Sequence, residues 1–155
     1  MIIHFVCRGN TYRSRLAETY LNSKQIPNIK AISSGIEAEN NISGPITWYA
    51  QRIIQKEHLV PFEKPNWQKT TKELLDLGDL TVFMKKDIYD FCVNNFGFNN
   101  KNFAVWEIPD ANETEVDWKT ASEETKIKIT ENTFEEIKRR VDKLLAKSTF
   151  TGRVE

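Results

Sequence analysis

The fold is decided by a stretch near the N-terminus, residues 2–18, which has the sequence IIHFVCRGNTYRSRLAE. Residues 2–6 are β-rich and apolar apart from His4, as expected of a strand that is covered on both faces of a parallel sheet. A polar loop follows over residues 7–14, and the apolar residues after it recur at helical spacing. The stretch therefore predicts a buried strand, then a loop, then a helix.

The rest of the chain continues this alternation. Short apolar runs bounded by turn residues predict three more strands, at residues 29–32, 80–84 and 103–106. Helical spacing and cap residues predict the remaining helices, at residues 45–54, 70–77, 87–95 and 127–145. Strands that alternate with helices predict one α/β domain, with a parallel sheet and helices on both of its sides.

Two details of these helices follow from single residues. Asp87 is the expected N-cap of the helix over residues 87–95, and Gly97 is its expected stop signal. The apolar spacing of the long terminal helix is interrupted near Thr130 and Asn132, and the outer face of this helix is expected to be charged.

Composition limits the classes of function. The chain has 155 residues, near the usual size of one domain, and its 22 Lys and Arg balance its 22 Asp and Glu. A neutral chain lacks the basic excess that favours nucleic acid, so no nucleic-acid partner is expected. No apolar run approaches the ~20 residues of a membrane helix, and the first residues lack a charged leader. We therefore expect a cytoplasmic protein without a membrane partner.

The chain has two cysteines, Cys7 and Cys92. They are too few for a disulfide scaffold and lack the paired spacing of a zinc site, so they are expected to be thiols. Cys92 falls on the apolar face of its predicted helix, where we expect an inert core residue.

The loop after the first strand is the predicted ligand site, because ligands of an open parallel sheet bind beyond the carboxyl ends of its strands. Gly9 and Asn10 can adopt backbone angles that aim successive amides inward, and the next helix directs its positive dipole end to the same point. This arrangement suits a phosphate or another tetrahedral oxyanion, and Arg13 adds a planar fork for two of its oxygens. A nucleotide loop is disfavoured, since no G-x-G-x-x-G occurs and no Gly-Lys-Ser/Thr follows.

Cys7 stands at the base of this loop and would attack phosphorus. A helix N-terminus and a nearby arginine favour the thiolate form of a cysteine, and Ser14 lies where its hydroxyl can donate to the sulfur. These residues predict hydrolysis of a phosphate ester in two steps, through a cysteinyl-phosphate. The leaving oxygen needs a proton from an acid on another loop. The candidates that follow the fourth strand are Glu107, Asp110, Glu113, Glu115 and Asp117.

The same stretch resembles the signature of the low-molecular-weight protein tyrosine phosphatase family, V-C-x-G-N-x-C-R-S-P followed by x-A-E. The matching residues are Val6, Cys7, Gly9, Asn10, Arg13, Ser14, Ala17 and Glu18. The resemblance extends to residues 33–35, 83–84 and 106–110 and so covers most of the chain. It implies a four-stranded parallel sheet flanked by helices on both faces, a Rossmann-like phosphatase fold without a metal or an organic cofactor. Residues 1–147 would form the phosphatase domain and residues 148–155 a C-terminal tail.

The resemblance also implies roles. Cys7 would be the nucleophile, Ser14 its hydrogen-bonding partner and Arg13 the oxyanion clamp. Asp110 would be the general acid, because the family's acid belongs to an Asp-Pro pair, although Ala111 replaces that proline here. The phosphate-binding residues would be Arg8, Gly9, Asn10, Thr11, Tyr12, Arg13 and Ser14. The expected ligands are a phosphorylated protein or peptide and inorganic phosphate or another tetrahedral oxyanion.

Two departures from the signature lie near the loop. Tyr12 replaces the usual second cysteine, so the disulfide that protects the nucleophile in many relatives cannot form between these positions. Arg15 replaces the signature proline, which adds a positive charge near the phosphate and loses a residue suited to the first helical turn. Together with Ala111, these changes leave open a degenerate module that binds phosphate without turnover.

Phosphotyrosine is the family's usual substrate, and two other activities stay open. Thr11 matches a threonine of the family's protein arginine phosphatase branch. Glu37 and Glu39 stand where relatives often carry an aromatic platform, and two carboxylates there would favour a basic substrate. A thiol arsenate reductase would need two further cysteines, of which only Cys92 is present. The sequence leaves the oligomeric state open.

Tryptophans invite a stacking role at such a site. Trp48 follows Pro45 on a predicted helix and is expected in the core, whereas Trp67 and Trp118 lie in segments that the pattern does not place.

Overall fold

The structure is a computed structural model that describes the backbone of residues 1–154 and the side chains of residues 1–147. Its strands are β1 (Ile2–Cys7), β2 (Lys30–Gly35), β3 (Leu80–Phe83) and β4 (Phe103–Val105). Its α-helices are α1 (Arg13–Ser23), α2 (Trp48–Lys56), α3 (Lys72–Leu77), α4 (Lys86–Phe96) and α5 (Glu123–Val154). Three short 3-10 turns are η1 (Ala38–Asn40), η2 (Val60–Phe62) and η3 (Ala111–Glu113).

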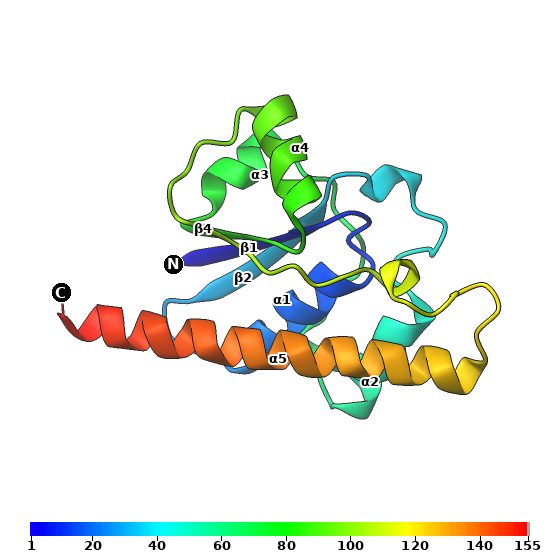
Figure 1. Cartoon of the computed structure of the whole chain (residues 1–155). Helices are drawn as coiled ribbons and strands as arrows, with labels where there is room; N and C mark the ends of the chain where they lie inside the picture. Colours follow the sequence, from blue (N-terminus) through cyan, green and yellow to red (C-terminus); the bar gives the residue numbers. More distant parts are fainter. Residues whose placement is uncertain (155) are drawn as a thin grey trace.

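The four strands form one parallel sheet in the order β2-β1-β3-β4. Figure 1 shows α1 and α5 on one face of the sheet and α3 and α4 on the other, while α2 packs against α1 and α5. This three-layer arrangement confirms the predicted α/β fold, a four-stranded parallel sheet with helices on both faces.

The core lies between the sheet and its helices. Phe5 and Val6 of the central strand β1 are fully buried, as are Val82 and Phe83 of the neighbouring β3. A strand covered on both faces needs such a continuous apolar run, which explains why apolar and polar residues do not alternate regularly over residues 2–6. Helix α5 contributes its own buried stripe to the same core, with Phe134, Ile137, Val141 and Leu145.

Helix α5 runs without a break past Thr130 and Asn132, where the apolar spacing is interrupted, so the prediction of one long terminal helix is confirmed. Thr130 is buried, and its hydroxyl donates to the carbonyls of Lys126 and Ile127 at 3.0 Å each. Bonds of this kind to the preceding turn satisfy a threonine inside a helix, which is why the polar residue does not end it.

Of the two caps predicted for α4, the C-terminal one is confirmed and the N-terminal one is wrong. Gly97 ends the helix in the left-handed conformation with φ of 65°, as predicted. The N-cap is Lys85 rather than Asp87, which lies within the first turn and pairs with Arg8 instead.

The described side chains hold no group of three or more His, Cys, Asp or Glu arranged for a metal ion. No helix of the described part is long and apolar enough to span a membrane. The side chains of the predicted tail, residues 148–155, lie outside the described residues, so the domain boundary at residue 147 stays a prediction.

Two features of the fold shape the site. The chain leaves the central strand β1 for β2 on one side, while β3 and β4 lie on the other, so the strand order reverses at the carboxyl end of β1. Such a reversal opens a crevice for ligands. Gly35 then allows the loop after β1 to approach closely, because a Cβ there would lie 2.6 Å from the Arg8 carbonyl oxygen and 2.7 Å from the Asn10 nitrogen.

Candidate active site

Residues 7–14 form a loop that joins the end of β1 to the first turn of α1, and we call it the anion loop. Its bend is made by Asn10, which has a left-handed φ of 55°. The Asn10 side chain is buried and donates to the hydroxyls of Ser14 at 2.7 Å and Ser33 at 2.9 Å. Its amide oxygen accepts from the Gln68 backbone N–H at 2.8 Å. These bonds hold an asparagine in a conformation that most residues avoid.

Cys7 lies at the bottom of the anion loop, next to the N-terminus of α1. Its Sγ is 2.8 Å from the Ser14 Oγ and 3.2 Å from the Asn10 backbone nitrogen, which donates to it. Both neighbours can donate a hydrogen bond to sulfur, and the helix dipole adds positive potential at the same point. The Ser14 hydroxyl, the Asn10 amide and the N-terminus of α1 therefore converge on the sulfur.

A buried polar network supports the loop from below. Ser33 donates to the Glu18 carboxylate, and Lys64 lies 3.6 Å from that carboxylate and donates to the Ser33 carbonyl at 2.8 Å. Burial raises the pKa of Glu18 against the opposing effect of Lys64, and burial lowers the pKa of Lys64 against the effect of Glu18. Each charge thus compensates the other in the core beneath the loop.

Arg13 is the first residue of α1, and its side chain is almost completely buried. Nη1 donates to the Ile108 carbonyl at 2.8 Å, and Nη2 lies 3.3 Å from Oδ2 of Asp110. The segment that follows β4 therefore holds the Arg13 guanidinium in place through two contacts. A planar donor held in this way keeps its remaining N–H groups in a defined direction for an anion.

Asp110 is held by a capping box in place of the rigid Asp-Pro pair. It is the N-cap of η3, with its Oδ1 accepting from the Ala111 N–H at 2.8 Å, and its own N–H donates to Glu113 at 2.8 Å. Although burial acts to raise it, the pKa of Glu113 is lowered by the Asp110 N–H and by the charges of Arg13 and Lys85. The loop is thus ordered by hydrogen bonds where the signature uses a proline ring.

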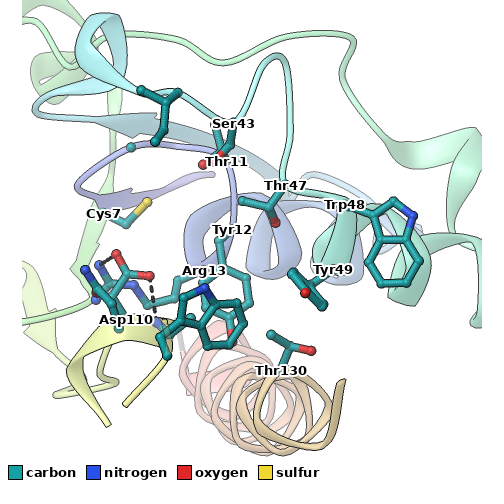
Figure 2. A pocket seen from close by; sticks show the side chains of 15 residues that line it. Cys7, Thr11, Tyr12, Arg13, Ser43, Thr47, Trp48, Tyr49, Asp110 and Thr130 are labelled. Atoms are coloured by element: carbon teal, nitrogen blue, oxygen red, sulfur yellow. Dashed lines mark hydrogen bonds and ion pairs between the residues drawn. The ribbon is translucent and has the colours of Figure 1, made fainter. Parts of the chain in front are cut away.

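A cavity of about 560 Å³ opens above Cys7 (Figure 2). Figure 2 shows the side chains of Cys7, Arg13 and Asp110 at one end of it and those of Thr47, Trp48 and Tyr49 at the other. Among the five carboxylates after β4, Asp110 is the one that lines the cavity. The complete lining is Cys7, Gly9, Thr11, Tyr12, Arg13, Ile42, Ser43, Thr47, Trp48, Tyr49, Asp110, Ala111, Asn112, Trp118 and Thr130.

Aromatic rings form one wall of this cavity. Tyr49 packs edge to face against Trp48, with ring centroids 5.0 Å apart, and against Trp118, with centroids 5.2 Å apart. The Tyr49 hydroxyl donates to Glu123 at 2.7 Å and so links the wall to the start of α5. This wall offers an apolar, π-rich surface to a substrate ring.

The sequence pattern suggests a stacking role for the aromatic residues but places Trp48 in the core and leaves Trp118 unplaced. Trp48 instead lines the cavity, with 60% of its surface exposed. The sequence did carry a signal for the exposure of Trp48. Ala50, Ile53 and Ile54 form the buried face of α2. Since successive residues of a helix are rotated by about 100°, Trp48 lies about 200° from Ala50, on the opposite face. Trp118 had no such signal, because it reaches the cavity from a loop whose path depends on tertiary contacts.

Some predicted phosphate-binding residues lie elsewhere. The Arg8 side chain does not line the cavity and pairs instead with Glu37 at 3.3 Å and with Asp87 at 2.6 Å. Glu39 pairs with Lys69 at 3.1 Å. The two acidic residues therefore each pair with a local cation, and neither lines the cavity.

The other residues singled out by the sequence also have clear positions. The Arg15 side chain is fully buried behind the anion loop and does not line the cavity. Tyr12 is buried, and burial raises the pKa of its hydroxyl, which lies near Thr133 and Asp110. Cys92 is buried in α4, where desolvation raises its pKa to about 12.

A parallel sheet that ends in an anion loop with a cysteine at its base defines a cysteine-based phosphatase. Comparison with known families agrees, since the family described as low molecular weight phosphotyrosine protein phosphatase matches residues 2–151. The chain belongs to this family.

Individual relatives agree with this assignment. A low molecular weight protein-tyrosine-phosphatase, PtpB of Staphylococcus aureus, is 33% identical over 107 residues, which are 69% of this chain and 73% of that protein. A protein-arginine-phosphatase of Geobacillus stearothermophilus is 28% identical over 94 residues, 61% of each chain. The fold is similar to that of the arginine phosphatase YwlE with a phosphorylated active-site serine, with a TM-score of 0.75 and 23% identity over the full length of both chains.

Proposed function

We propose that this chain removes phosphate from phosphorylated protein side chains, with phosphotyrosine as the substrate, in the cytoplasm. The observation that carries the proposal is the Cys7 sulfur, held 2.8 Å from Ser14 and 3.2 Å from the Asn10 amide at the bottom of a cavity that Arg13 and Asp110 also line. Nucleophile, anion clamp and acid thus share one cavity, as a covalent phosphoryl transfer requires.

In the first chemical step, the Cys7 thiolate attacks phosphorus. The Sγ–P bond forms while the bond to the tyrosyl oxygen breaks, and protonated Asp110 gives its proton to that oxygen. The backbone amides of residues 8–14 and the Arg13 fork hold the three equatorial oxygens as charge develops on them. The products are the free tyrosine hydroxyl and a cysteinyl-phosphate.

In the second step, water attacks the cysteinyl-phosphate. The Asp110 carboxylate accepts a proton from this water, the new O–P bond forms, and the Sγ–P bond breaks. The Ser14 hydroxyl donates to the departing sulfur, which makes the thiolate a better leaving group. Release of inorganic phosphate restores Cys7 and a protonated Asp110.

The aromatic wall supports phosphotyrosine over other side chains. Trp48, Tyr49 and Trp118 offer edges and faces that suit an aryl ring between the anion loop and solvent. Glu37 and Glu39 pair with Arg8 and Lys69, so they give little support to a basic substrate.

A protein arginine phosphatase is the second candidate. Thr11 lines the cavity, and its carbonyl accepts from the Thr47 N–H at 2.9 Å. A hydroxyl there would assist hydrolysis of a phosphoramidate and would lose apolar contact with an aryl ring.

The test is phosphate release from para-nitrophenyl phosphate and from phosphotyrosine and phosphoarginine peptides. We expect turnover of the aryl phosphate and of the phosphotyrosine peptide, inhibition by vanadate and loss of turnover in Cys7→Ser. Faster turnover of the phosphoarginine peptide would favour the second candidate. Binding of phosphate without hydrolysis of any of these substrates would instead identify a degenerate binding module. Consumption of arsenate with thioredoxin would identify a reductase, although the buried Cys92 is poorly suited to that role.

A further inference from the structure

Arg15 is a buried cation just behind the anion loop. Its side chain is fully buried in the first turn of α1, where an unpaired charge would carry a large desolvation penalty. The burial lowers its pKa, while the nearby carboxylates of Glu18 and Glu63 and the Cys7 sulfur raise it. A residue kept charged in such a place needs a compensating set of acceptors.

Three backbone carbonyls from three segments provide that set. Nη1 donates to the Asn10 carbonyl at 3.2 Å and to the Pro45 carbonyl at 2.7 Å, and Nη2 donates to the Lys64 carbonyl at 2.6 Å. Asn10 belongs to the anion loop and Pro45 to the loop that carries the cavity residues Ile42, Ser43 and Thr47. Lys64 belongs to the segment that also supports Asn10 through Gln68 and Ser33.

The bond to Asn10 has a direct geometric consequence. The Asn10 carbonyl and the Thr11 N–H belong to one trans peptide unit, so they point in opposite directions. Because Arg15 holds the carbonyl toward the core, the Thr11 N–H points away from the core, toward the cavity that Thr11 lines. Asn10 has a left-handed φ of 55°, a conformation that is strained in a non-glycine residue and persists only where surrounding contacts hold it.

We propose that Arg15 is a positioning residue of the active site. Its guanidinium fixes the orientation of the Asn10–Thr11 peptide and joins the anion loop to the cavity wall at Pro45, so that an amide of the loop faces the substrate phosphate. This inference rests on the proposed function, in which the anion loop holds that phosphate. It also explains why an arginine stands where the signature of the family has a proline: the hydrogen bonds of Arg15 give the loop the order that the proline ring would give to the turn.

The experiment compares Arg15→Met, which removes the charge and the three hydrogen bonds, with Arg15→Lys, which keeps the charge and at most part of the bonds. Arg52→Met is the matched control, because Arg52 is a partly buried arginine of α2 that pairs with Glu131 at 2.7 Å and does not line the cavity. Melting temperature and circular dichroism show which variants fold.

The readouts are the vanadate inhibition constant, kcat/KM for para-nitrophenyl phosphate and the hydrogen exchange of peptides that cover residues 8–14 and 41–47. In Arg15→Met we expect weaker vanadate inhibition and lower kcat/KM, each by about tenfold or more, and faster exchange in both segments. In Arg15→Lys we expect Cys7 alkylation at pH 6 to stay near the wild-type rate, because the charge remains, while exchange in both segments is still faster.

Folded variants with vanadate inhibition and exchange within twofold of wild type would overturn the proposal. So would equal changes in Arg52→Met, or a failure of both Arg15 variants to fold, since Arg15 would then serve only the stability of the core. Hydrogen exchange separates this inference from the proposed function. If the wild-type chain hydrolysed no phosphate compound, the proposed function would fail, and exchange would still show whether Arg15 orders the two loops.

Discussion

Nη2 of Arg13 lies 3.3 Å from Oδ2 of Asp110, so the proposed anion clamp and the proposed general acid form an ion pair in the wall of the cavity. The arginine is almost fully buried, whereas about a third of the Asp110 side chain is exposed. The carboxylate therefore has room to rotate when a phosphate takes its place beside the guanidinium. An anion that binds Arg13 would therefore compete with the Asp110 carboxylate for the guanidinium.

The first prediction is that Asp110→Asn lowers turnover and strengthens anion binding. Without the acid, kcat for a phenyl phosphate with a poor leaving group falls by about 10²-fold to 10⁴-fold, and the fall is smaller for para-nitrophenyl phosphate. Loss of the negative charge beside Arg13 removes a competitor of phosphate, so the phosphate inhibition constant falls. Steady-state kinetics with both leaving groups checks the result, and Glu115→Gln is the control. An equal loss for both leaving groups would contradict the acid role.

The second prediction concerns the 2.8 Å contact between Ser14 and the Cys7 sulfur. Hydrogen bonds to charged groups contribute about 1.5–3 kcal/mol, so Ser14→Ala should lower kcat by about 10-fold to 100-fold and slow Cys7 alkylation at pH 6. Ser33→Ala is the control, because it removes a partner of Asn10 but no partner of the sulfur. If both variants behave alike, Ser14 acts by supporting Asn10 rather than the thiolate.

Much of the fold and the path of the anion loop could be predicted because their signals are local. The run of apolar residues before Cys7, the glycine of the loop and the helical spacing after Ser14 all lie within 20 residues. The side chains of Arg8 and Arg15 could not be placed, since their partners Asp87 and Lys64 are distant in sequence. An arginine near a phosphate loop suggests phosphate binding, whereas here long-range acceptors take both guanidinium groups.

The third prediction is that the two thiols differ in reactivity. Burial raises the pKa of Cys92 to about 12, so this residue stays a protonated, shielded thiol at pH 8. One equivalent of iodoacetamide should therefore react with the folded chain, at Cys7, and vanadate should protect it. Peptide mass spectrometry locates the label. Labelling of Cys92 at a comparable rate in the folded chain would contradict the burial seen in α4.

The same chemistry predicts the response to peroxide. With Tyr12 beside the nucleophile in place of a second cysteine, oxidised Cys7 has no nearby resolving thiol and proceeds to the sulfinic acid. As exposure to peroxide continues, dithiothreitol should therefore restore a decreasing fraction of the phosphatase activity. In Tyr12→Cys, a larger fraction should be recovered after the same exposure, because a disulfide can form within the loop. Equal recovery in both proteins would show that another group protects Cys7.

The fourth prediction concerns acid stability. His4 is fully buried, its Nε2 lies 2.7 Å from the Ser34 hydroxyl, and burial together with the charge of Lys64 lowers its pKa from 6.5 to about 3. The unfolded chain therefore binds a proton below pH 6.5 that the folded chain does not. The His4 contribution is fully present above pH 6.5 and is lost as the pH falls toward 3, by up to about 1.4 kcal/mol per pH unit.

Urea unfolding of the wild type and of His4→Gln at pH 7, 6 and 5 measures this effect. Glutamine keeps an amide for Ser34 but does not titrate, so its free energy of unfolding should fall less between pH 6 and 5. Parallel pH dependence of the two proteins would mean that other groups, such as the carboxylates, account for the acid response.

The fifth prediction separates the two candidate substrates. Thr11 lines the cavity and is almost fully buried, so replacing its hydroxyl by a methyl or ethyl group changes the surface that faces the leaving group. If phosphotyrosine is the substrate, Thr11→Ile should leave kcat/KM for a phosphotyrosine peptide within about tenfold of wild type or raise it, because apolar contact with the ring increases. Thr11→Val keeps the shape of threonine without the hydroxyl and so separates polarity from size. A wild-type preference for a phosphoarginine peptide that disappears in both variants would instead assign the hydroxyl a role in cleaving the P–N bond. The aromatic wall of Trp48, Tyr49 and Trp118 would then have to contact residues of the substrate next to the phosphoarginine.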